Sequence, residues 1–125
     1  MAINSNIKEL TKAEEQVMQE LWKLKQAFVK DIVQELPDPK PAVNTISTIV
    51  RILEQKGFVG HTAQGRSFQY HPLITRDDYA SFAANNVISK YFGDSAEKLL
   101  SFFVKEKKMD LTTLDEVLKQ MNKEK

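Results

Sequence analysis

The chain of 125 residues contains no cysteine, which excludes disulfide bonds and thiolate metal sites and fits a protein of the reducing cytoplasm. It has no run of about 18 apolar residues, so no transmembrane helix is predicted. Its first ten residues, MAINSNIKEL, have no apolar core of the kind found in signal peptides. We therefore expect a cytoplasmic protein that does not insert into a membrane.

Residues that carry chemistry are also scarce. The two histidines, His61 and His71, fall on predicted strands, and two histidines without a third ligand make a poor zinc site. The four glycines are scattered, so there is no Gly-rich phosphate loop. The acidic pairs at 14–15 and 77–78 fall in first helical turns, where carboxylates favour the positive end of the helix dipole. The sequence thus predicts no enzyme, no cofactor and no metal site.

Charge is unevenly distributed along this nearly neutral chain. Residues 1–39 carry five Lys and seven acidic residues, a net charge of −2, and residues 72–125 carry nine of each sign, a net charge of 0. Residues 40–71 carry four basic residues against Glu54 alone, a net charge of +3. A polyanion could dock on this basic middle third, although an excess of this size also arises by chance.

The spacing of apolar residues predicts three helices in the first half of the chain, at about 11–24, 27–36 and 43–56. The first begins with Thr11 and Glu14 at capping-box spacing. The third has no clear N-cap, since Ala42 is a poor capping residue. After Gly57 the apolar residues alternate in two runs separated by Gln64 and Gly65, which predicts a β-hairpin.

Three further helices are expected in the second half of the chain. Their predicted capping pairs are Thr75 with Asp78, Asp94 with Glu97, and Thr112 with Asp115. Three helices followed by a hairpin are the arrangement of a winged helix. The predicted fold is therefore mainly α: an N-terminal winged helix of three helices plus a β-hairpin wing at 1–73, then a three-helix C-terminal dimerisation region at 74–125.

The third predicted helix has an outer face without the usual Glu and Lys. Its apolar stripe consists of Ile46, Ile49, Val50 and Leu53. The residues expected at the functional face are Asn44, Thr45, Ser47, Thr48 and Arg51. Short hydrogen-bonding side chains with one arginine suit base edges and phosphates in the DNA major groove, and Arg66 at the hairpin turn could reach the backbone. A solvated helix face is the simpler alternative.

The last three predicted helices carry more apolar surface than a short helical region usually hides. The helix that follows Asp94 is apolar on more than one side. Such helices usually bury this surface against a second copy of the chain, and the alternative is that they fold back on the N-terminal domain. The residues expected to form the dimer interface are Tyr79, Phe82, Leu99, Leu100, Phe103, Val104, Leu114 and Leu118.

Three motifs together resemble the penicillinase-repressor (BlaI/MecI-like) family of bacterial winged-helix regulators. They are LTKAEEQVMQELW near the N-terminus, NTISTIVRILEQKGFV over the third predicted helix, and GRSFQYHPLI over the second strand. The resemblance extends from about Lys8 to Met121, and the motifs stand in the order and spacing of that family.

The resemblance implies a homodimeric transcriptional repressor. Each subunit would place its third helix in the major groove of one half of an inverted-repeat operator, and the C-terminal helices would form the dimer. Members of this family often act downstream of a membrane sensor metallopeptidase, whose activation leads to cleavage of the repressor within the dimerisation region. The Asn-Phe pair cleaved in the family falls on Phe102 and Phe103 here.

The chain also departs from the family pattern. Pro41 and Ala42 stand where the family has Trp-Ser, and Ser47 replaces a common lysine. Fewer cations predict weaker salt-dependent binding to phosphates and a different operator. Phe102 replaces the Asn of the cleavage pair, and the cysteines of copper-responsive relatives are absent. The alternative prediction belongs to a different class of function. It is a winged helix that docks a partner protein through the same polar face.

Overall fold

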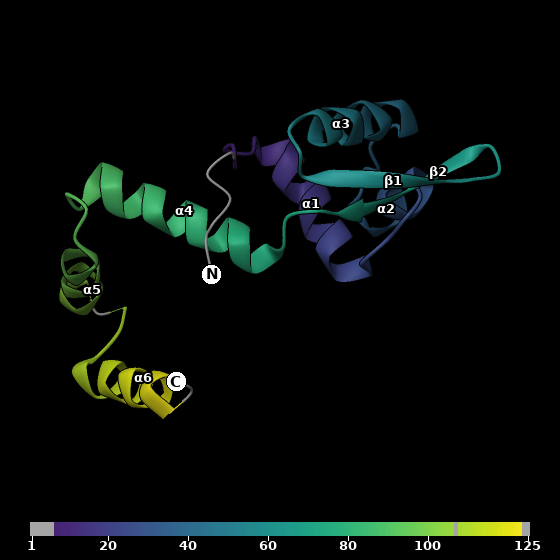
Figure 1. The fold of residues 1–125 in the computed structure, drawn as a ribbon. Coiled ribbons are helices and arrows are strands. Elements are labelled where there is room, and N and C mark those ends of the chain that lie inside the picture. The colour runs from purple at the N-terminus through teal and green to yellow at the C-terminus, as the bar shows by residue number, and fades with distance from the viewer. Residues whose placement is uncertain (1–6, 107, 124–125) are drawn as a thin grey trace. The chain divides into compact units, whose positions relative to one another are not determined.

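The computed structural model describes residues 7–106 and 108–123 (Figure 1). The elements follow in the order α1 (Lys12–Leu24), α2 (Val29–Glu35), α3 (Val43–Gln55), β1 (Val59–Gln64), β2 (Ser67–Pro72), α4 (Arg76–Tyr91), α5 (Ala96–Lys105) and α6 (Leu111–Lys123). This order confirms the predicted mainly α fold, with three helices and a hairpin followed by three helices. None of the helices in the described residues is long and apolar enough to span a membrane.

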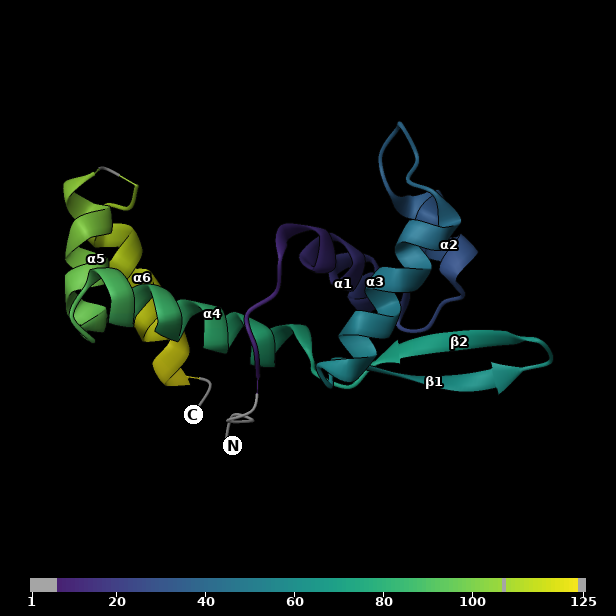
Figure 2. The same ribbon diagram turned by 90° about the horizontal axis from the view of Figure 1, so that it is seen from above.

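The chain divides into two compact units, one ending at Ala83 and the other beginning at Ala84, so the division along the sequence falls within α4. The predicted boundary between residues 73 and 74, which separates a DNA-binding domain from a dimerisation domain, stays a prediction. In the N-terminal unit, α3 packs against α1 and α2, and the hairpin packs against α1, α2 and α3. The tip of the hairpin extends beyond these helices in both views (Figures 1 and 2).

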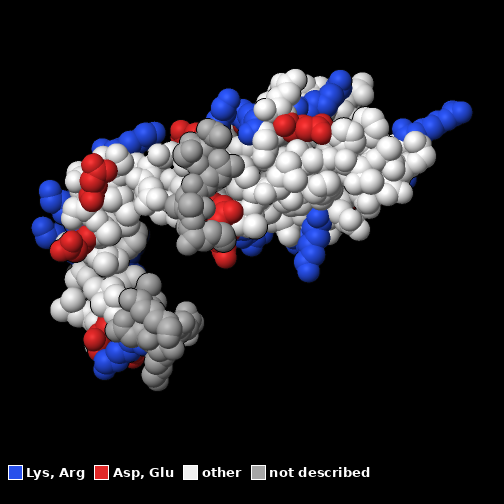
Figure 3. Space-filling view, in the orientation of Figure 1, with Lys and Arg blue, Asp and Glu red and all other residues white. Residues whose placement is uncertain are grey.

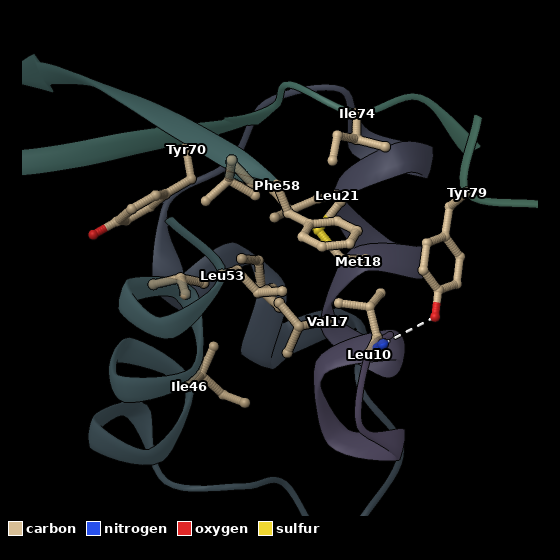
Figure 4. Packing of buried hydrophobic residues seen from close by; sticks show 14 of the residues in the cluster. Leu10, Val17, Met18, Leu21, Ile46, Leu53, Phe58, Tyr70, Ile74 and Tyr79 are labelled. Carbon is tan, nitrogen blue, oxygen red and sulfur yellow. Dashed lines mark hydrogen bonds between the residues drawn. The ribbon is translucent and has the colours of Figure 1, made fainter. Parts of the chain in front are cut away.

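The core of the N-terminal unit is built from the apolar stripes of its helices and from the roots of its strands (Figure 4). Met18, Leu21 and Phe58 lie at its centre and are fully buried. Burying side chains of this size stabilises the fold by roughly 1.5–3 kcal/mol each. On α3, the buried residues are Ile46, Val50 and Leu53, so the side of α3 that faces the core is fixed by the stripe that its sequence predicts.

The local signals at the helix ends were mostly predicted correctly. The Thr11 hydroxyl accepts a hydrogen bond from the Glu14 N–H, and the Glu14 carboxylate accepts one from the Thr11 N–H, which confirms the capping box. Ala42 makes no side-chain cap for α3. Gly57, just beyond the end of α3, has φ +83°, a conformation that glycine adopts at little cost.

Two predicted caps were wrong. Ser95, not Asp94, caps α5 by accepting a hydrogen bond from the Lys98 N–H. Asp94 instead has φ +63° and belongs to the turn that precedes the cap. For α6, the Asp110 carboxylate accepts the bond from the Thr113 N–H, so the cap stands two residues before the predicted one.

The hairpin is antiparallel, and Ala27 extends it by a single residue. Val59 pairs with Pro72 at one end and Gln64 with Ser67 at the other. Ala27, between α1 and α2, exchanges two backbone hydrogen bonds with Tyr70, 2.9 and 2.8 Å long. A lone hairpin is marginal in water, so this bridge and the packing on the helices hold the hairpin in place.

Candidate nucleic-acid interface

Helix α3 presents a polar outer face opposite its buried stripe. Asn44, Thr45, Thr48 and Arg51 are exposed, and Ser47 is half-buried beside them. No acidic residue lies in the first turn of α3. The five residues predicted as DNA-binding on this helix therefore lie on a surface that the core of the unit does not use.

Two of these side chains are steadied by the backbone one turn earlier. The Thr48 hydroxyl donates to the Asn44 carbonyl at 3.0 Å, and the Arg51 Nε–H donates to the Ser47 carbonyl at 3.3 Å. Thr48 can still accept hydrogen bonds, and the terminal nitrogens of Arg51 can still donate them. The face thus offers both donors and acceptors, as contacts with base edges require.

The wing places one cation at its tip. Gly65 has φ +63° and makes the turn between β1 and β2, and Arg66 follows it with an exposed side chain. Figure 3 shows a basic side chain projecting at the tip of the hairpin, and Arg66 is the one Lys or Arg between Val59 and Pro72. Arg66 is therefore free to reach an anion beyond the helices.

Contacts on one side of the hairpin join it to α3. The His61 Nδ1 lies 2.6 Å from Oε2 of Glu54, and the His61 ring stacks on Phe68 with centroids 4.3 Å apart. His61 pairs with Tyr70 in the ladder, so His71, the next residue along β2, faces the other side of the hairpin. The two histidines do not form a shared site, and the described residues hold no cluster of three or more His, Asp or Glu that could bind a metal.

A hollow of about 400 Å³ lies between α2, α3 and the wing. It is lined by Phe28, Val29 and Lys30 from α2 and its N-cap, Ser47 from α3, and Gln64, Ser67, Phe68 and Tyr70 from the hairpin. Burial raises the pKa of the Tyr70 hydroxyl, and the Glu54 carboxylate adds to this rise, so the hydroxyl stays protonated at neutral pH. The hollow is thus lined mainly by uncharged side chains, and Lys30 is the one charged residue on its lining.

The orientation of α3 is supported by one ion pair at its C-terminal end. Lys56 Nζ lies 2.6 Å from Oε1 of Glu14, whose side chain is buried. Burial raises the pKa of the Glu14 carboxyl, but the bond from Lys56 and the backbone bond from Thr11 outweigh this, so its pKa lies below the ordinary value. The pair therefore joins the start of α1 to the end of the polar helix.

The predicted dimerisation residues fall into two groups in the structure. Tyr79 and Phe82 pack on the core of the N-terminal unit. Tyr79 is 8% exposed, its ring lies 5.7 Å from that of Phe58, and its hydroxyl accepts a hydrogen bond from the Leu10 N–H (Figure 4). The structure thus accounts for the burial of Tyr79 within one protomer.

The remaining residues of that set lie on α5 and α6 and are less covered. Leu99, Leu100, Phe103, Val104 and Leu114 are half-buried, and Leu118 is 46% exposed. Leu100, Val104 and Leu114 line, with Leu111, an apolar groove of about 430 Å³. None of the residues of α5 is fully buried within the protomer, so the helix keeps apolar surface available for a further contact.

The predicted cleavage pair lies inside a regular helix. Phe102 and Phe103 fall in the second half of α5, where Phe102 is 45% exposed and its ring lies 5.6 Å from that of Phe92. A peptidase binds its substrate as an extended strand, so cleavage here would require local unwinding of α5.

One exposed residue of α3 was not singled out by the sequence pattern. Val43, the first residue of the helix, is 51% exposed although it is apolar and β-branched. Its position beside Asn44 places it at the end of the polar face.

Comparison with known proteins agrees with this geometry. The chain matches the family described as penicillinase repressor over residues 10–123. It is 28% identical over 116 residues to the methicillin resistance regulatory protein MecI of Staphylococcus aureus strain N315, covering 92% of this chain and 94% of that protein. It is 23% identical over 112 residues to the penicillinase repressor of Bacillus licheniformis, covering 89% and 88% of the two chains.

Among solved structures, the DNA-binding domain of the repressor BlaI is similar to this chain with a TM-score of 0.52 and 32% sequence identity. The match covers 58% of this chain and 90% of that domain. The match supports the winged-helix assignment. Together with the family match over nearly the whole sequence, it identifies this chain as a member of the penicillinase repressor family, whose proteins are transcriptional repressors and not enzymes.

Proposed function

We propose that this protein represses transcription in the cytoplasm by binding an inverted-repeat operator as a homodimer. In each subunit α3 enters the major groove and the wing contacts the adjacent backbone. The observation that carries the proposal is the outer face of α3, where Asn44, Thr48 and Arg51 are exposed and take no part in the core. Membership of a repressor family and likeness to the DNA-binding domain of BlaI support it.

The chemistry of the face suits bases in the major groove. Amide and hydroxyl groups such as those of Asn44 and Thr48 donate to and accept from base edges, and an arginine forms paired bonds with guanine or binds phosphate. Thr45 and Ser47 lie on the two flanks of this row, where they can bond to neighbouring bases or phosphates.

The wing and the hollow suit the sugar–phosphate backbone. Arg66 projects from the tip of the hairpin, and Lys30 lies on the lining of the hollow between α2, α3 and the wing. Phosphate contacts fix the orientation of a protein on DNA without selecting sequence. In this proposal the backbone of one strand lies along the hollow while α3 contacts the bases beside it.

Dimerisation belongs to the C-terminal unit in this proposal. The half-buried and exposed apolar residues of α5 and α6, among them Leu100, Phe103 and Leu118, would pack against a second copy. Two tethered α3 helices then bind two half-sites, and the tether raises the effective concentration of the second helix at its half-site.

Release from DNA is the remaining part of the proposal. The family resemblance implies cleavage between Phe102 and Phe103 after a membrane sensor metallopeptidase is activated. A cut in α5 would separate part of the apolar surface from the DNA-binding unit and so weaken the dimer.

A selection from random duplex DNA with the full-length protein tests the proposal. We expect enrichment of an inverted repeat whose binding saturates at two subunits per site. Its affinity should fall steeply with salt, because each phosphate contact releases condensed counterions. Failure to enrich any sequence, with salt-independent or absent DNA binding, would instead favour a winged helix that docks a partner protein.

A further inference from the structure

The first turn of α3 combines polar residues with one exposed apolar side chain. Val43 is the first residue of the helix and is 51% exposed. A single exposed apolar residue is common on protein surfaces, so its meaning depends on its position. Val43 precedes Asn44 and stands one helical turn before Ser47, at the flank of the face that the proposed function assigns to base contacts.

The position favours contact with bases. Helices of the helix-turn-helix class touch base edges mainly with residues at their N-terminal end. Side chains of a helix lean toward that end, and a β-branched side chain has little rotamer freedom to lose when it is buried. Val43 would therefore lie at the flank of the α3 face, on the side of Ser47, and could touch a base edge there when Asn44 and Thr48 contact the bases.

The chemistry of the side chain restricts what it can meet there. Each base edge in the major groove presents donors and acceptors, and the one apolar group among them is the C5-methyl of thymine. Val43 cannot form hydrogen bonds, so covering a donor or acceptor would leave that group unsatisfied at a cost in free energy. A thymine methyl is the partner that gains from the contact.

From these observations we infer that Val43 determines specificity by packing on the C5-methyl group of one thymine in each half-site. The inference rests on the proposed function. It adds to that function an apolar contact beside the hydrogen bonds proposed for the polar residues of α3. It also names the chemical feature of the operator that Val43 would recognise, which is the C5-methyl group of one thymine.

Replacing thymine with deoxyuridine tests this contact, because uracil pairs as thymine does and lacks only the methyl group. Each thymine of the selected operator is replaced in turn, symmetrically in both half-sites, and the dissociation constant of the full-length protein is measured. We expect one position where the replacement weakens binding about three- to fivefold per half-site, the factor associated with burying one methyl-sized group.

The same series is then measured with Val43→Ala. This variant should bind thymine and uracil operators almost equally at the sensitive position, while its response at every other position stays unchanged. Leu73→Ala removes another exposed apolar side chain, outside α3, and should show the sensitivity of the parent protein. Because Val43 is exposed, its truncation should leave the melting temperature nearly unaltered.

The outcomes separate the inference from the function on which it rests. A parent protein that binds a selected operator but shows no uracil-sensitive position dependent on Val43 overturns the inference and leaves the proposed function standing. A parent protein that selects no DNA sequence at all overturns both.

Discussion

Lys56 at the end of α3 lies 2.6 Å from Glu14 at the start of α1, and the two residues are separated by 42 positions in the sequence. The Glu14 carboxylate also accepts the backbone bond of Thr11. One carboxylate therefore completes the cap of the first helix and fixes the far end of the helix that we propose contacts DNA. Both consequences can be measured.

Lys56→Met should lower the free energy of unfolding by about 1–3 kcal/mol, because it leaves a buried carboxylate with one charged hydrogen bond fewer. Chemical denaturation checks this value. A cycle with Glu14→Gln measures the coupling itself, since glutamine keeps an acceptor for the Thr11 N–H. Additive effects of the two changes would show that the pair does not stabilise the fold.

The same pair predicts a dependence on pH. The pKa of Glu14 is lower in the folded chain than in the unfolded chain, so its contribution is present above the unfolded value of about 4.3 and is lost as the pH falls through the folded value. The parent protein should therefore lose stability between neutral pH and about pH 3 more steeply than Lys56→Met. Parallel curves for the two proteins would contradict the assignment.

Much of the N-terminal unit could be predicted because its signals are local. The capping box of Thr11 and Glu14 spans one helical turn, and the stripe of Ile46, Val50 and Leu53 repeats at helical spacing. The bridge between Ala27 and Tyr70 could not be predicted, since a single residue has no periodicity and its partner lies far along the chain.

The pattern of apolar residues in the sequence also could not show which apolar surfaces pack against each other. Tyr79 stands on an apolar helix face, and only the structure shows that this face packs on Trp22 and Phe58. Val43 stands three residues before Ile46 and seven before Val50, a spacing that predicts burial. It is exposed because it lies at the end of α3, beyond the part of the helix that the core covers.

Arg66→Ala tests the wing. If Arg66 contacts phosphate, its removal should weaken binding to all DNA sequences alike and reduce the slope of log affinity against log salt by about one unit. Lys12→Ala removes the same charge from an exposed position on α1 and should leave the slope unchanged. A weakening restricted to one base position would show instead that Arg66 contacts a base.

Leu118→Asp tests the proposed dimer. Leu118 is 46% exposed in the protomer, so the change should not disturb the folding of one chain, but it would bury an unpaired charge in an interface between copies. Light scattering should show monomers at micromolar concentration, with operator binding greatly weakened. Gln120→Asp adds the same charge at another exposed position of α6 and should stay dimeric. A parent protein that is itself monomeric at tens of micromolar would contradict the two-fold arrangement.

The central claim is that the outer face of α3 selects the DNA sequence, and the double variant Thr48→Ala/Arg51→Ala tests it most directly. Both side chains are exposed, so the melting temperature should hardly change. The measurement is the ratio of affinities for the selected operator and for random DNA, with Lys12→Ala/Gln16→Ala on the exposed side of α1 as the control of equal charge. Expressed as a binding free energy, the preference for the operator should fall by about 1–3 kcal/mol for each base that the variant no longer recognises, and it should be unchanged in the control. A double variant that keeps the selectivity of the parent protein would show that α3 does not determine it.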